Sequence, residues 1–322
     1  MSKRVFIKSI TCIREEADCD SFVLNEKQKV LSPKWNGSSF MTKQNAMLCM
    51  CVEEVLKQAN IDSISLKEAG VFIGNGGIFP SKKMITSLIR FSGKDEDIDY
   101  ECLSQNIDKI PPLEGVRNLP TAADFFLAKN FDIHNVGNPM YLGDDSGLLC
   151  LFRAQENVQL GKINTAVVAA SDHKDRILQK LFSLTADVSY CSKNGACAMV
   201  ISNMPNDCVG EILEYYDEWL PEGVDLEEIV SKHLIHFTNK ERISQVVINT
   251  KCSDIENRCC AICKQFFPKS VKCFNKYLGY RGTASGLSNL YLGLSELKSQ
   301  ESFLLISVNP GGLIGSIVVK KI

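Results

Sequence analysis

SGLLCLFRAQENVQLGKINTAVVAAS, residues 146–171, decides the fold, because its pattern returns near the end of the chain as SGLSNLYLGLSELKSQESFLLISVNP, residues 285–310. In both copies Ser-Gly-Leu begins a run whose apolar residues have the three- to four-residue spacing of one helix face. A short apolar run then follows, TAVVAAS in the first copy and FLLISV in the second. The repeat predicts two helix-then-strand units.

Matching segments surround each copy. GACAMVIS (195–202) and GLIGSIVVK (312–320) read as the next strands, and AGVFIGNGG (69–77) and QVVINTK (245–251) read as earlier ones. Their apolar residues are continuous rather than alternating, which is typical of strands buried on both faces and covered by helices. The sequence therefore predicts an α/β protein made of two similar halves.

The two halves are expected to meet near residue 205, giving domains 1–205 and 206–322. CVGEILEY (208–215) is predicted to be the first strand of the second half, and the helix-like KQNAMLCMCVEEVLKQANI (43–61) belongs to the first. The acidic stretch DEWLPEGVDLEEIV (217–230) reads as a solvated connection.

Composition excludes several functional classes. The chain has 322 residues, 45% of them hydrophobic, and a formal net charge of −2 with both signs interspersed. Nucleic acid is therefore not an expected partner, since a basic face is missing. No apolar run approaches the roughly 20 residues needed to span a bilayer, and the start does not resemble a signal peptide. We expect no membrane association and a cytoplasmic location.

Fourteen cysteines are present, mostly within apolar periodic stretches. That placement favours reduced thiols acting as small core residues. The densest group is Cys252, Cys259, Cys260 and Cys263, within the helix-like DIENRCCAICKQFF. A zinc site usually has a second Cys-x-x-Cys or a spaced His pair, and neither follows, so we expect no metal.

The order of these motifs resembles the β-ketoacyl synthase family, which has the thiolase fold. The segment TAADFFLAKNFDIHNVGNPMYLGDDSGLLCLFRAQENVQLGKINTAVVAASD (121–172) is similar to the family's core, in which a turn carrying the nucleophile precedes a long buried helix. NGACAMVIS (194–202) and NPGGLIGSIVVKK (309–321) resemble its later strand and its terminal Gly-rich hairpin. The resemblance implies two duplicated α/β halves in a five-layer αβαβα arrangement.

Three reactive positions of the family are changed. The family places a cysteine nucleophile in the turn that corresponds to residues 143–147, and this position is Asp144 here. Its two histidines correspond to the neighbourhood of Asn249 and to Tyr280, while the family's lysine corresponds approximately to Lys276. The sequence therefore predicts a turn that has lost its nucleophile and a site with no catalytic residue.

Two interpretations of the carboxylates in this turn stay open. In the first, Asp144 or Asp145 is an N-cap that stabilises the following helix by about 1 kcal/mol. In the second, Asp144 acts as a general base or decarboxylating group. An ionised carboxylate would repel a malonyl carboxylate, which favours the structural interpretation.

The resemblance implies a specific role. Ketosynthase-like subunits without the cysteine, such as the chain-length factors of type II polyketide synthases, pair with an active ketosynthase and limit chain growth. Aspartate replaces their usual glutamine here. The expected function is thus a non-catalytic subunit of a β-ketoacyl synthase (acyltransferase) complex, in polyketide or aryl-polyene synthesis.

The expected partners are an active ketosynthase and an acyl carrier protein, whose phosphopantetheine would deliver the substrate, so no cofactor of its own is expected. Phe125, Phe126, Met140 and Tyr141 are the candidates for the tunnel and the subunit interface. The alternative for any one of them is an ordinary core position.

Two other classes remain. One is an independent acyl-thioester enzyme, an acyltransferase, decarboxylase or hydrolase, built around Asp144, Asp145, Tyr280 and Arg281. The other is a metal or redox protein that uses the cysteine cluster.

Overall fold

The computed structural model describes the following residues: 3–15, 22–23, 35–37, 41–76, 86–87, 89–91, 99–110, 119, 121–135, 137–173, 190, 193–220, 223–238, 243–268, 270–309 and 312–322. Gly77, at the end of the predicted strand 69–77, and Pro310 and Gly311 of the terminal hairpin lie outside them.

Eleven strands form one mixed sheet in the described part of the chain. The strands are β1 (Val5–Glu15), β2 (Phe22–Val23), β3 (Gly70–Asn75), β4 (Gly137–Met140), β5 (Thr165–Asp172), β6 (Gly195–Ser202), β7 (Gly210–Trp219), β8 (Ile243–Asn249), β9 (Val271–Lys272), β10 (Ser302–Val308) and β11 (Leu313–Lys321). Their order is β4-β3-β5-β6-β1-β7-β11-β10-β8-β9, with β2 paired to β1.

The sheet repeats one topology on each side of the β1–β7 junction. Outward from the junction the order is β1-β6-β5-β3-β4 on one side and β7-β11-β10-β8-β9 on the other. β3 and β8 each pair in parallel with two neighbours, whereas β6 and β11 each pair antiparallel with two. The predicted duplication of strands is therefore confirmed.

The junction itself was not predicted. β1 and β7 pair antiparallel from Val5 opposite Ile212 to Ile7 opposite Gly210, and this pairing joins the two halves into one sheet. Residue 205 lies in the connection from β6 to β7. The division into two domains at that point stays a prediction.

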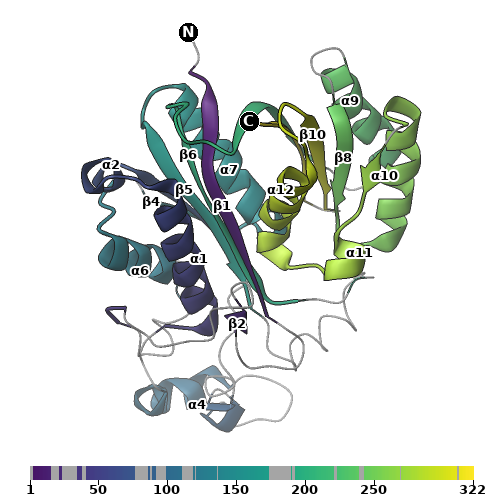
Figure 1. Cartoon of the computed structure of the whole chain (residues 1–322). Coiled ribbons are helices and arrows are strands. Elements are labelled where there is room, and N and C mark those ends of the chain that lie inside the picture. Colours follow the sequence, from purple (N-terminus) through teal and green to yellow (C-terminus); the bar gives the residue numbers. More distant parts are fainter. Residues whose placement is uncertain are drawn as a thin grey trace.

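Helices cover both outer faces of the sheet and fill the space between its halves (Figure 1). The helices are α1 (Lys43–Ala59), α2 (Ser63–Lys67), α4 (Tyr100–Gln105), α6 (Ala122–Phe131), α7 (Ser146–Gln159), α9 (Leu226–Thr238), α10 (Ser253–Phe266), α11 (Asn275–Leu278) and α12 (Ser285–Glu296), with 3-10 turns η2 (Ile107–Lys109), η3 (Gly143–Asp145) and η4 (Gly282–Ala284). α7 and α12 contact each other at the centre, with α1 and α6 outside one half and α9 and α10 outside the other. The thiolase-like five-layer arrangement is confirmed.

Three apolar cores correspond to these layers. The largest joins α7 and α12 to both halves of the sheet, and each of the others lies beneath one outer pair of helices. β5, β6 and β10 are buried along almost their whole length, as their continuous apolar runs predict. Burial on both faces explains why these strands show no polar alternation.

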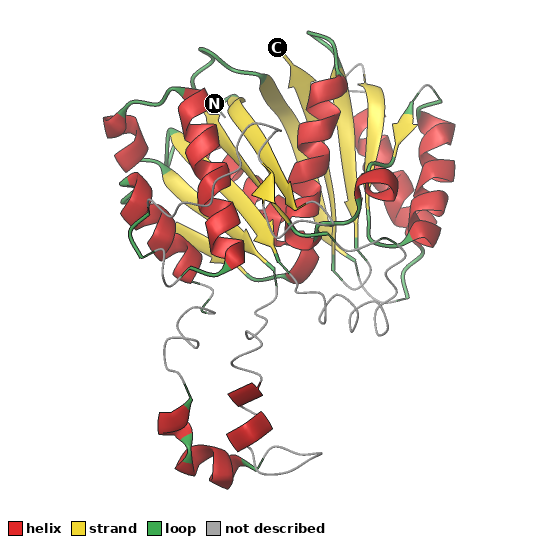
Figure 2. Ribbon diagram, turned by 60° about the horizontal axis from the view of Figure 1, so that its bottom comes forward, coloured by secondary structure: helices red, strands yellow, loops and turns green. Residues whose placement is uncertain are grey.

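α4 lies away from the layers (Figure 1 and Figure 2), and η2 contacts it. No helix among the described residues is both long and apolar enough to cross a bilayer. The cytoplasmic location stays a prediction.

One expectation about a connection was wrong. The stretch 217–230 was expected to be a solvated link, but β7 runs to Trp219 and α9 begins at Leu226. Leu226, Ile229 and Val230 are buried in the core under α9. Three apolar residues spaced three and four apart form one buried helix face despite the acidic residues between them.

Candidate functional site

Two matching turns meet at the amino-terminal ends of the central helices. LGDDSGLL (142–149) forms η3 and begins α7, and RGTASGLS (281–288) forms η4 and begins α12. Each 3-10 turn begins with a glycine of positive φ, 60° at Gly143 and 49° at Gly282. Glycine adopts this conformation at little cost, which is why both turns can bend sharply into a helix.

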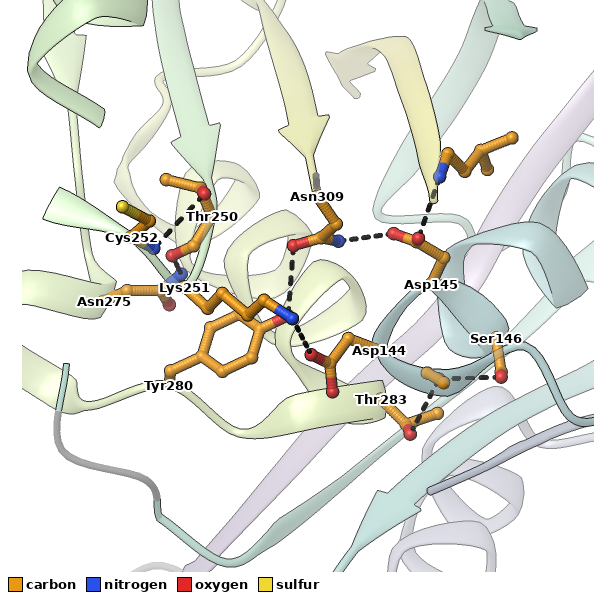
Figure 3. A network of polar contacts seen from close by, with 12 residues as sticks. Asp144, Asp145, Ser146, Thr250, Lys251, Cys252, Asn275, Tyr280, Thr283 and Asn309 are labelled. Carbon is orange, nitrogen blue, oxygen red and sulfur yellow. Dashed lines mark hydrogen bonds and ion pairs between the residues drawn. The ribbon is translucent and has the colours of Figure 1, made fainter. Parts of the chain in front are cut away.

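The two turns are in direct contact. Thr283 Oγ1 donates to the carbonyl oxygen of Gly143 at 3.3 Å, and Ser146 Oγ donates to the same oxygen at 2.8 Å (Figure 3). A Cβ on Gly147 would lie 2.3 Å from the carbonyl oxygen of Thr283. Only glycine permits this approach of α7 to η4, so the turns are held in a fixed relation.

Asp145 joins the first turn to the terminal hairpin. Its Oδ2 accepts from the backbone N–H of Leu313 at 3.0 Å, and its Oδ1 accepts from Nδ2 of Asn309. The side chain is buried, and burial raises the pKa of Asp145 to about 6 although both hydrogen bonds lower it. Both carboxylate oxygens therefore have partners within the chain.

Asp144 points to the other side, towards the second half (Figure 3). Its Oδ2 lies 3.5 Å from Nζ of Lys251, the second residue after β8, and 24% of the Asp144 side chain is exposed. Asp144, the residue expected to correspond to the nucleophile of the ketosynthases, is thus one partner of an ion pair between η3 and the end of β8.

Tyr280 lies beside both aspartates in the interior. Its hydroxyl donates to Oδ1 of Asn309 at 3.3 Å, and Asn309 in turn donates to Asp145. Burial, with a smaller effect from the carboxylates of Asp144 and Asp145, holds the pKa of Tyr280 well above its usual range. The phenol stays protonated and cannot accept a proton as a histidine would.

Asn249, at the end of β8, lies within a buried amide network. Its Nδ2 donates to Ser307 Oγ at 2.8 Å, and its Oδ1 accepts from Asn275 at 2.9 Å and from Asn289 at 2.7 Å. Asn275 also donates to the carbonyl oxygen of Thr250 at 3.1 Å. The network fixes the end of β8 against α11 and α12 and leaves neither polar atom of Asn249 without a partner.

The three changed positions form hydrogen bonds and one ion pair, and neither a thiol nor an imidazole stands at any of them. A hydroxyl or thiol nucleophile is activated by an adjacent base, a lowered pKa or a metal ion, whereas a carboxylate is already an anion. Asp144 faces Lys251, Tyr280 is a donor, and Asn249 is neutral at every pH. The geometry resembles a structural junction.

The N-cap interpretation of the aspartates is wrong. Asp145 precedes α7 but its side chain makes no capping hydrogen bond, and the residue before η3 makes none either. The carboxylates turn away from the helix and bond to Leu313, Asn309 and Lys251 instead. The 3-10 turn η3 already supplies backbone acceptors before α7, so both carboxylates bond to residues that are distant in the sequence.

The tunnel and interface candidates fall into two groups. Phe125 on α6 and Tyr141 after β4 are exposed by 55% and 38%, and Met140 is half-buried at the end of β4. Phe126, by contrast, is buried among the apolar residues that α6 shares with α1 and β3. The roles of all four stay predictions, and Phe126 does not reach the surface.

Three of the grouped cysteines lie on α10, as the helical pattern predicts, and Cys252 directly precedes this helix. Cys252, Cys259 and Cys263 are buried, whereas Cys260 is partly exposed. Among the described residues, no three His, Cys, Asp or Glu side chains gather in a way that could hold a metal ion.

Several residues of the site were missed by sequence reasoning. Lys251 follows QVVINT directly, and Asn309 begins the Asn-Pro-Gly-Gly turn, so their places at strand ends were a usable signal. Asp172 ends β5 and lies against η4, since a Cβ on Gly282 would be 1.7 Å from its Oδ2. Asn275 and Asn289 gave no signal, because only the fold brings them to Asn249.

The comparisons with known proteins agree with this architecture. No protein-family model matches the sequence, and no curated protein sequence matches it. Solved structures do match. One is a chain from a complex of a type II polyketide synthase acyl-carrier protein with its ketosynthase bound to the hexaketide, with TM-score 0.76, 16% identity and coverage of 100% of both chains.

Two others are equally similar. The ishigamide ketosynthase/chain length factor has TM-score 0.77 and 11% identity over 100% of both chains. A β-ketoacyl synthase from Burkholderia phymatum has TM-score 0.77 and 11% identity over 99% of this chain and 100% of that one. At such identities the likeness establishes the fold: the chain has the thiolase-like fold of the ketosynthases.

Proposed function

We propose that this protein is a non-catalytic ketosynthase-like subunit, a chain-length factor, that pairs with an active ketosynthase in a polyketide or aryl-polyene synthase. One observation supports this most strongly. Each of the three positions expected to correspond to the reactive residues of the ketosynthases has a polar contact within the chain: Asp144 with Lys251, Tyr280 with Asn309, and Asn249 with Ser307. None of these three positions holds a thiol or an imidazole, the groups that the ketosynthase reaction is expected to need.

The partners follow from the same proposal. An acyl carrier protein would present the growing chain on its phosphopantetheine, so this subunit would need no cofactor of its own. Two of the similar structures are a ketosynthase bound to an acyl-carrier protein and a ketosynthase/chain length factor, which supports these two classes of partner.

The edge strand β4 is the surface that best suits a partner subunit. β4 ends one side of the sheet, so one edge of its backbone has no strand partner among the residues that the structure describes. An open edge can accept a strand from another chain. Three apolar side chains near β4 are exposed. Tyr141 and Leu142 follow the strand in the chain, and Phe125 lies on α6, a helix that contacts the strand. Apolar side chains at an open edge are typical of an interface.

Co-expression with a ketosynthase that retains cysteine and both histidines tests the proposal. An affinity tag on this chain should recover the ketosynthase in a one-to-one ratio, and the pair should extend malonyl units on the carrier protein. A well-behaved monomer that leaves the ketosynthase's products unchanged would contradict the proposal.

The length of the product tests the tunnel role. Tyr141→Ala should lengthen the products of the pair by removing bulk beside the interface, as mass spectrometry of the released chains would show. Tyr100→Ala is the control, because Tyr100 is equally aromatic, 76% exposed and on the distant helix α4. Equal product lengths in both variants would exclude Tyr141 as the residue that stops elongation.

An independent acyl-thioester enzyme is the second candidate. It is favoured by the partial exposure of Asp144 beside Lys251 and Tyr280, which leaves one carboxylate near the solvent. Turnover of an acyl carrier protein substrate by the purified chain alone, lost in Asp144→Asn, would support it.

A further inference from the structure

Cys260 and Cys273 form a pair of thiols outside the site described above. Cys260 lies on α10 and Cys273 follows β9, and their sulfur atoms are 3.3 Å apart. Both side chains are partly exposed. A disulfide has an S–S bond of about 2.05 Å, so the sulfur atoms need to approach by little more than about 1 Å.

The two thiols have opposite electrostatic surroundings. The hydrogen bond with Cys273, helped by Lys264 and Lys276, lowers the pKa of Cys260. The same hydrogen bond, burial and the carboxylate of Glu256 hold the pKa of Cys273 well above its usual range. Cys260 is thus the thiol of the pair that loses its proton more readily, and the thiolate is the attacking form.

The thiols of Cys259 and Cys197 are more deeply buried and ionise less readily than that of Cys260. Cys259 is buried beside Cys260, and burial raises its pKa to about 12. Cys12 and Cys197 are also close, at 2.8 Å, but Cys197 is completely buried and its pKa is held well above the usual range by burial. Proximity and partial exposure of both sulfurs coincide at Cys260 and Cys273.

We propose that Cys260 and Cys273 are a redox-active pair that closes to a disulfide by exchange with a small-molecule disulfide such as glutathione disulfide. The Cys260 thiolate attacks one sulfur of glutathione disulfide, forming a mixed disulfide and releasing one glutathione thiolate. The Cys273 thiol then loses its proton and attacks Sγ of Cys260, which releases the second glutathione. Two protein thiols are oxidised, and one glutathione disulfide is reduced to two glutathione thiols.

The Cys260–Cys273 pair lies close in the chain to the buried amide network around Asn249. Cys273 is two residues before Asn275, which donates to Asn249 and to the carbonyl of Thr250. A disulfide would therefore tie the outer helix α10 covalently to the segment that holds the end of β8. This modification does not depend on the proposed function of the chain.

Non-reducing peptide mapping of the folded full-length chain after incubation with glutathione disulfide tests the proposal. Trypsin should yield CCAICK (259–264) joined to CFNK (273–276), with fragmentation placing the link at Cys260, and the link should vanish on reduction. The absence of this linked pair, or prior linkage of Cys12 to Cys197, would overturn the proposal.

Single variants identify the attacking thiol. In Cys273→Ser the glutathione adduct should accumulate on Cys260, whereas Cys260→Ser should leave Cys273 without an adduct. Cys208→Ser, at a partly exposed thiol on the β6–β7 connection, is the control and should form the disulfide as the parent does. A thermal unfolding scan of each variant verifies that it is folded. An adduct on Cys273 in Cys260→Ser, with none on Cys260 in Cys273→Ser, would overturn the assigned order.

Discussion

Both polar atoms of Asn249 are bonded within the chain, to Ser307 on one side and to Asn275 and Asn289 on the other. Asp145 is bonded in the same way to Leu313 and Asn309. Each of these side chains is buried, so its hydrogen bonds are needed to offset the loss of water. At the scale of single residues, Asp145 bonds the first half of the chain to the second, whereas the bonds of Asn249 hold the end of β8 within the second half.

Asp145 and Asp144 should differ in their effects on stability. Asp145→Ala leaves the N–H of Leu313 and the amide of Asn309 without acceptors, and we expect it to lower the free energy of unfolding by about 2 kcal/mol or more. Asp144→Ala removes a partly exposed ion pair and should cost less than about 1 kcal/mol. Urea unfolding measures both, and equal costs would contradict the assignment of Asp145 to the junction.

His233 should make stability depend on pH in the acidic range. The ring is completely buried between Ser316 and Glu218, at 2.7 Å and 3.3 Å, and burial lowers the pKa of His233 from 6.5 to about 4. Its contribution to stability is present above about pH 6.5 and is lost as the pH falls through about 4. As the pH falls through this range, the free energy of unfolding of the His233→Gln variant should therefore decrease less than that of the parent protein.

The pH dependence of stability that Asp145 causes has the opposite sign. Because burial raises the pKa of Asp145 from 3.8 to about 6, the pH-dependent part of its contribution to stability is present below about pH 4 and is lost as the pH rises through about 6. Asp145→Asn should therefore gain less stability than the parent on acidification. Unfolding free energies measured from pH 4 to 7 separate the two groups, and a His233→Gln curve parallel to the parent's would refute the role given to His233.

At the scale of elements, α7 and α12 are held together at their amino-terminal ends by close backbone packing. Gly147→Ala would place a Cβ 2.3 Å from the carbonyl oxygen of Thr283 and 2.8 Å from Cβ of Ala170, so α7 must move away from η4 and β5. We expect a loss of about 2 to 3 kcal/mol in the free energy of unfolding.

Gly137→Ala is the matched control for this change. The nearest atom to a Cβ on Gly137, Cγ of Asp124, is 3.7 Å away, which is an ordinary contact. The control should change stability by no more than about 0.5 kcal/mol. Similar losses in both variants would contradict the close packing of α7 against η4.

The elements were largely predictable from the sequence, because each strand and helix is encoded locally. The apolar run of β5 and the helical spacing in α7 have close copies in β10 and α12, and both copies fold alike. The contacts of the site were less predictable. The carboxylate of Asp145 was expected to cap its own helix, but it bonds to Leu313, a partner that only the folded hairpin brings near.

At the scale of the whole molecule, the two halves share one sheet through β1 and β7, and their central helices present matching turns to one another. The reactive site of a ketosynthase would lie where these turns meet. In this chain the same place contains the Asp144–Lys251 ion pair and the Tyr280–Asn309–Asp145 hydrogen bonds. The architecture is retained, while the arrangement at its centre supports the proposal that the chain shapes a partner's reaction.

An assay of covalent acylation tests directly whether this chain attacks an acyl thioester by itself. The purified chain, incubated with a radiolabelled acyl group on an acyl carrier protein, is denatured and examined for bound label, beside an active ketosynthase as positive control. We predict label on the ketosynthase cysteine and none on this chain. Label bound to any side chain of this protein in the absence of a partner would contradict the account.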